Sequence, residues 1–99
     1  MGAKLLSDSQ IEAGLKNIPE WERDKDAIKR TLVLRDFREV VSLLVLIAFD
    51  AEEADHHPDV TINYKRLHFS LSTHSEGGLT EKDLALAGKI DEAFARRAG

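Results

Sequence analysis

Apolar residues along the chain follow helical and extended spacing in turn. A capping sequence running from Ser7 to Gln10 precedes apolar residues three and four positions apart, and Pro19 ends this segment. The pattern predicts a first amphipathic helix on the surface. A second capping residue, Asp36, precedes a longer helical pattern that continues to about Ala54.

Alternation of apolar and polar residues predicts four strands in two pairs. Residues 21–24 and 28–34 alternate on either side of a polar turn at residues 24–26, which is typical of a hairpin. Residues 60–64 and 67–74 form the second pair. The polar face of this second pair carries His68, Ser70 and Ser72, so it is expected to face water or to form a binding wall.

The helix at residues 36–54 is apolar around most of its circumference. Its widest apolar face comprises Phe37, Val40, Val41, Leu44, Ile47, Ala48 and Ala51. A helix of this kind is buried on more than one side. We expect one side to pack on the sheet and the other on a second subunit, which makes the protein a homo-oligomer. Thr80 and Asp83 open a last helix that carries a further apolar stripe.

The order of elements is therefore αββαββα. Paired strands separated by single helices indicate an α+β fold, with a four-stranded antiparallel sheet and its helices packed on one face. A chain of 99 residues supports a single domain, and we expect it to span residues 1–99.

Composition and charge exclude several classes of protein. The 14 basic and 18 acidic residues give a net charge of −4, which argues against binding to nucleic acid or to an anionic membrane surface. Cysteine is absent, so disulfides and cysteine-ligated metal sites are excluded. The longest apolar stretch, residues 40–49, is far shorter than the roughly 20 residues that cross a bilayer. A cytoplasmic location is the default expectation.

Titratable side chains crowd where the long helix gives way to the third strand. Within this stretch lie Glu52, Asp55, His56 and His57, and the next pair of strands is followed by His74 and Asp83. If the two strands form a hairpin, its open ends meet and all three histidines become neighbours. Imidazoles titrate near neutral pH and suit general acid–base catalysis. Glu52 stands four residues before His56, a spacing that would let it orient that ring on a continuous helix.

The residue string across this region resembles the signature of a known family. The string is Glu52-x3-His56-His57-Pro58-x5-Tyr64-x9-His74-x8-Asp83. It matches the pterin-4a-carbinolamine dehydratases at every defined position, and the flanking residues from Leu71 to Thr80 agree. The resemblance is dense from Asp36 to Asp91 and weaker before it. Val60 stands where animal members often carry tryptophan, so an aromatic stack on the pterin is not carried over.

The resemblance implies a specific reaction and partners. Family members dehydrate 4a-hydroxytetrahydropterin, of which 4a-hydroxytetrahydrobiopterin is one example, to quinonoid dihydropterin, without a metal or another cofactor. This step supports tetrahydrobiopterin recycling and implies a functional link to a pterin-dependent hydroxylase. The family also implies a homodimer or homotetramer.

The resemblance, together with the chemistry, suggests roles for individual residues. We expect His56 and His74 to transfer protons near the leaving hydroxyl, while His57 holds or deprotonates the pterin. The candidates for substrate binding or support are Glu52, Asp55, Asp83 and Tyr64, and Asp83 could also complete a capping box with Thr80. Tyr64 falls on the apolar face of its strand, which favours core packing over substrate contact. His68 is interpreted as a surface histidine and Asp59 as a solvated charge.

Two other classes of function stay open at this stage. A metal site could use the oxygen and imidazole ligands of Asp55, His56, His57 and His74. Alternatively, the chain could be a non-catalytic dimerisation or interaction module that retains these residues.

Overall fold

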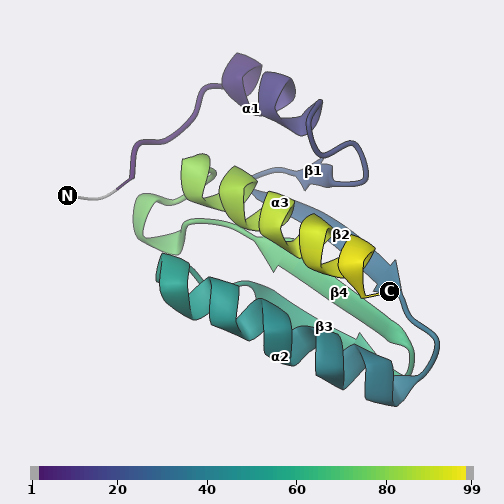
Figure 1. Cartoon of the computed structure of the whole chain (residues 1–99). Coiled ribbons are helices and arrows are strands. Elements are labelled where there is room, and N and C mark those ends of the chain that lie inside the picture. The colour runs from purple at the N-terminus through teal and green to yellow at the C-terminus, as the bar shows by residue number, and fades with distance from the viewer. Residues whose placement is uncertain (1–2, 98–99) are drawn as a thin grey trace.

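The computed structural model describes residues 3–97 and shows the predicted order of elements (Figure 1). The elements are α1 (Asp8–Leu15), β1 (Glu22–Asp24), β2 (Ala27–Val33), α2 (Phe37–Ala54), β3 (Asp59–Asn63), β4 (Arg66–Leu71), a 3₁₀ helix η1 (His74–Glu76) and α3 (Glu81–Arg96). The αββαββα prediction is confirmed, with η1 as an addition. In residues 3–97, no helix combines the length and apolar character needed to cross a membrane.

The four strands form one antiparallel sheet in the order β1-β2-β4-β3. The two hairpins therefore join through β2 and β4, and β3 is left at one edge. Helices α2 and α3 pack against each other on the same face of the sheet (Figure 1). The other face is open, and Thr31 and His68 form one of its cross-strand pairs. This arrangement confirms the predicted fold class.

The core lies between the sheet and these two helices. Both layers supply side chains that are almost completely buried: Ile28, Leu32, Leu67, Phe69 and Leu71 from the sheet, and Val40, Leu43, Ile47, Leu86 and Ile90 from the helices. Helix α1 packs closely on α3, because a Cβ added at Gly14 would lie 2.5 Å from Cδ1 of Leu84. Glycine at this position permits the close approach of the two helices.

A half-buried polar network fastens the far end of α3 to the sheet. Nε1 of Trp21 donates to Oδ1 of Asp91 at 2.8 Å, and Nη1 of Arg30 donates to the same oxygen at 2.5 Å. The Arg30 guanidinium also lies over the ring of Phe94, 5.2 Å from its centroid. The tryptophan is 3% exposed, so this indole is part of the core as well as of the network.

The buried face of α2 differs from the predicted one. Val40, Leu43, Ile47 and Ala51 face the core, whereas Phe37 and Val41 lie outside it. The helix is so widely apolar that its sequence pattern does not select one face, and a single sheet can cover only one. Four of the uncovered apolar residues, Phe37, Val41, Val45 and Phe49, follow one another at intervals of four, and we call them the outer stripe.

Three strand boundaries also differ from expectation. β1 begins after Trp21, and β4 ends at Leu71, so His74 lies in η1 and not on the strand. Tyr64 is not in the core: it occupies the β3–β4 turn with φ of 53° and is 68% exposed. The register of β3 with β4 pairs Asn63 with Arg66, so the loop between them has two residues. A positive φ is typical of such tight hairpin loops.

Candidate active site

The three histidines of the sequence string gather at one end of the sheet. His56 and His57 follow α2, while His74 opens η1 directly after β4. They share one hollow of about 350 Å³, the histidine hollow, which is lined by Asp55, His56, His57, Ser72, Thr73, His74, Ser75 and Lys82. The β3–β4 hairpin therefore places residues distant in sequence around a single space.

The end of α2 determines where His56 points. Asp55 adopts φ of 51° and ψ of 43°, the left-handed conformation that commonly ends a helix. The backbone N–H of His56 then donates to the carbonyl of Ala51 at 3.0 Å. The left-handed residue ends the helix before His56, so the four-residue spacing no longer places His56 on the same face as Glu52.

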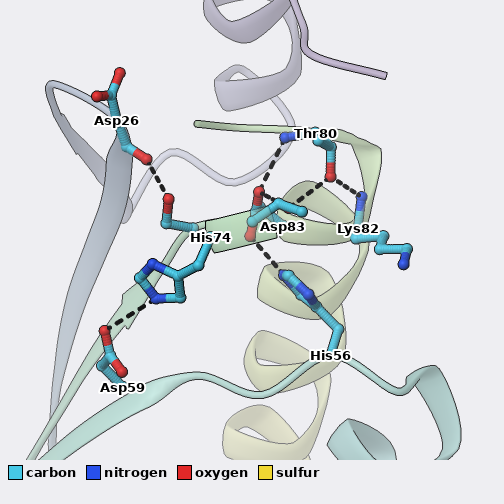
Figure 2. Close-up of polar contacts among 9 residues, drawn as sticks. Asp26, His56, Asp59, His74, Thr80, Lys82 and Asp83 are labelled. Atoms are coloured by element: carbon cyan, nitrogen blue, oxygen red, sulfur yellow. Dashed lines mark hydrogen bonds and ion pairs between the residues drawn. The ribbon is translucent and has the colours of Figure 1, made fainter. Parts of the chain in front are cut away.

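The partner of His56 is Asp83 from the first turn of α3 (Figure 2). Nε2 of His56 lies 2.6 Å from Oδ1 of Asp83; the histidine is 8% exposed and the aspartate is fully buried. The expectation that Glu52 orients His56 is wrong. Glu52 instead hydrogen-bonds Nε2 of His57, and this pair lies at the surface.

The second oxygen of Asp83 is also engaged. Oδ2 accepts from the hydroxyl of Thr73 at 2.8 Å and from the backbone N–H of Thr80 at 2.9 Å. The bond from Thr80 completes the capping box of α3, so Asp83 both caps the helix and holds His56. A carboxylate can only accept hydrogen bonds, so the neutral His56 ring carries its proton on Nε2. Any proton that His56 exchanges elsewhere must pass through Nδ1.

His74 has a carboxylate neighbour that sequence reasoning missed. Oδ2 of Asp59 lies 3.6 Å from Nε2 of His74, and both side chains are largely exposed (Figure 2). Asp59 was interpreted as a solvated charge because no local spacing links it to His74. The contact depends on the pairing of β3 with β4, which places Asp59 opposite Ser70.

A second hollow adjoins the first on the open face of the sheet. Its lining comprises Asp24, Lys25, Asp26, Ala27, Asp59, Ser70, Ser72, His74 and Gly77, so Ser72 and His74 are common to both hollows. The hydroxyl of Ser72 donates to the backbone carbonyl of Asp26 at 2.6 Å, which holds the β1–β2 turn against this space (Figure 2). The β1–β2 turn is thus a wall of the site, although no motif indicated it.

Two candidate residues lie away from the histidine hollow. Tyr64 stands at the opposite end of β3 from Asp59, about 16 Å along the strand. His68 lies on the open sheet face as expected, where its Nδ1 is 2.7 Å from the hydroxyl of Thr31. Neither residue lines either hollow.

The described residues contain no ligand set for the metal site considered above. Within residues 3–97, no three histidine or carboxylate side chains are grouped closely enough to hold a metal ion. The histidines instead face one carboxylate each, in the pairs His56–Asp83, His57–Glu52 and His74–Asp59. Such pairs can fix tautomers and exchange protons with a bound molecule.

Fold and site together define an α+β protein with a histidine–carboxylate cluster beside an open sheet face. The family model for pterin 4 alpha carbinolamine dehydratase matches residues 4–93. The chain belongs to this family.

Relatives agree over almost the whole length. A protein of Thermomicrobium roseum, provisionally named pterin-4-alpha-carbinolamine dehydratase, is 51% identical over 87 residues, covering 88% of this chain and 94% of the relative. A protein of Mycobacteroides abscessus with the same provisional name is 46% identical over 92 residues, covering 93% of this chain and 98% of the relative.

Solved structures share the fold. The crystal structure of a transcriptional coactivator/pterin dehydratase from Brucella melitensis has a TM-score of 0.88 and 32% identity, covering 91% of this chain and 98% of that one. A pterin dehydratase-like protein identified as a RuBisCO assembly factor in the alpha-carboxysome has a TM-score of 0.61 and 16% identity, covering 75% and 86%. The second likeness concerns the fold alone.

Proposed function

We propose that the protein dehydrates 4a-hydroxytetrahydropterin to quinonoid dihydropterin by general acid–base catalysis. The observation that carries this proposal is the histidine hollow itself. The exposed rings of His57 and His74 and the fixed ring of His56 line one space, within a chain of the dehydratase family.

The reaction needs two proton transfers and no change of oxidation state overall. The C4a–O bond breaks as an acid protonates the departing hydroxyl, and a base removes a proton from a ring nitrogen. The sum of the two is loss of one water. A positioned side chain contributes about 10²- to 10⁴-fold to such a step.

Each histidine suits a different part of this reaction. His74 supplies the proton to the leaving hydroxyl, and His57, held by Glu52, receives the ring proton. His56 takes part through Nδ1, because Asp83 occupies Nε2. Asp55 lines the same hollow beside them. No step requires a metal or another cofactor.

The test is an assay on chemically generated 4a-hydroxytetrahydropterin, corrected for its spontaneous dehydration. Catalytic amounts of the protein should accelerate decay of this species, also after extended treatment with a chelator. A decay rate equal to the spontaneous one, with correctly folded protein, would reject the function. Loss of activity with chelator and its recovery with added zinc would instead favour the metal alternative.

The same proposal includes the assembly and its setting. The outer stripe of α2 is the interface of a homodimer or homotetramer, since it leaves large apolar side chains uncovered in one chain. The protein works in the cytoplasm on pterin released by a pterin-dependent hydroxylase and so recycles tetrahydrobiopterin. The outer stripe also suits a second candidate function, that of a non-catalytic interaction module. The decay assay distinguishes a dehydratase from such a module.

A further inference from the structure

We propose that Asp59 is a positioning residue for His74. This inference rests on the proposed dehydratase function, and it concerns a carboxylate outside the residue string that resembles the family signature. Of the three histidines in the hollow, His56 and His57 have carboxylate partners within that string, namely Asp83 and Glu52. The partner of His74 is Asp59.

The backbone of Asp59 is held by the sheet. Asp59 is the first residue of β3 and pairs with Ser70 of β4. Paired residues in an antiparallel sheet share a face, and the alternate pairs Val60–Phe69 and Ile62–Leu67 place Phe69 and Leu67 in the core beneath the helices. Asp59 therefore projects from the open face, where it lines the second hollow together with Ser70 and His74.

His74 depends on such a neighbour because its own segment gives its ring no other partner. The ring extends from a single turn of 3₁₀ helix, its side chain is 75% exposed, and among the described residues Asp59 is the only one in polar contact with it. Without a fixed neighbour, an exposed imidazole samples several rotamers and both neutral tautomers.

The carboxylate of Asp59 removes this ambiguity. Facing Nε2, it favours hydrogen on that nitrogen, so the proton that His74 supplies to the leaving hydroxyl in the proposed reaction is one held on Nδ1 of the doubly protonated ring. The present separation of 3.6 Å exceeds a normal hydrogen bond. Catalytic hydrogen bonds are often long in the absence of substrate and shorten when it binds. Both side chains are exposed enough to make this adjustment by rotation.

Asp59 also stands where the two hollows meet. It lines the second hollow and touches the histidine that both hollows share. A ligand in either hollow would therefore act on the same pair of side chains, His74 and Asp59.

The experiment compares Asp59→Asn, Asp59→Glu and a control for loss of a carboxylate, Asp50→Asn. Asp50 lies on α2 and lines neither hollow. Two readouts are taken on the full-length protein: kcat and KM in the decay assay, and the ring ¹⁵N chemical shifts of His74, which report its tautomer.

We expect Asp59→Asn to lower kcat about tenfold with KM nearly unchanged, a smaller loss than removal of a proton-transfer group. The same variant should shift the His74 tautomer equilibrium. Asp59→Glu should restore most of both readouts, and Asp50→Asn should change neither.

Three results would overturn the assignment: kcat unchanged in Asp59→Asn, a loss of kcat without a change of tautomer, or an equal loss in Asp50→Asn. If the unaltered protein shows no dehydratase activity, the proposed function fails. The ¹⁵N comparison would then still establish whether Asp59 fixes the His74 ring.

Discussion

Nε2 of His56 lies 2.6 Å from Oδ1 of Asp83, and both side chains are buried, although the β3–β4 hairpin separates them along the chain. The same carboxylate also accepts from Thr73 and Thr80. Asp83 therefore connects three segments: the turn after α2, the end of β4 and the start of α3. Two of these segments carry the histidines of the hollow.

This connection predicts that Asp83→Ala is strongly destabilising. The substitution leaves three buried donors without their acceptor, and each buried donor that loses its partner costs about 1–3 kcal/mol. Urea unfolding followed by circular dichroism should show a loss of this order. His56→Ala should also destabilise the fold, because it removes a partner of the buried carboxylate. Glu53→Ala, at an exposed position on α2, is the control, and an equal midpoint for Asp83→Ala and Glu53→Ala would contradict the role of the network.

The exposed histidines should affect turnover without affecting the fold. His57→Ala and His74→Ala should each lower the dehydration rate by about 10²- to 10⁴-fold. The fold loss of rate in the double variant should be smaller than the product of the two single losses, because residues that act as a unit lower the same activation barrier. His68→Ala is the matched control on the open sheet face and should cost less than about threefold. A large loss in His68→Ala would place the substrate on another part of the sheet.

The outer stripe predicts self-association. Light scattering of a dilute solution should give at least twice the 11.1 kDa of one chain. The double substitution Val41→Glu with Phe49→Glu should lower this mass toward one chain, because it places charge in the interface. Val33→Glu changes an exposed apolar residue on the sheet and should leave the mass unaltered. A monomer at every concentration would reject the stripe as an interface.

Acid should weaken one contact at the start of α2. The backbone N–H of Arg35 donates to Glu39 at 2.9 Å, and this bond, with help from the Arg35 and Arg97 guanidinium groups, holds the pKa of Glu39 below its ordinary value of 4.5. The stabilisation is therefore fully present above pH 4.5 and is lost as the pH falls through the lower folded-state pKa. Glu39→Gln should lower the Tm at pH 7 and should lower it less at pH 3. A Tm difference that stays constant over this range would contradict the contribution of the charge.

Local signals predicted most of the fold correctly. The side chain of Ser7 accepts from the Gln10 backbone, and Asp36 caps α2 as expected. Both signals depend on residues within three or four positions of one another. The order in which the two hairpins join, with β2 beside β4, could not be predicted, because it depends on contacts between segments far apart in the sequence.

The contacts of the site could be predicted only in part. The expected hairpin brings His56, His57 and His74 around one space, but the helical spacing from Glu52 pairs His56 with the wrong carboxylate. The left-handed conformation of Asp55 changes the direction of the chain, and the spacing from Glu52 assumes a continuous helix. Asp59 was missed because its contact with His74 depends on strand register, which no local pattern encodes.

The network at the far end of α3 gives the protein an internal optical reporter. Trp21 is the chain's single tryptophan, and its indole is bonded to Asp91, about 12 Å along α3 from Asp83. Its emission therefore senses the docking of α3 on the sheet. In the proposed reaction the quinonoid pterin product, which absorbs light, would lie at the other end of this helix. Fluorescence quenching on substrate addition would then report energy transfer across the molecule, whereas a red shift would report that water has reached the core.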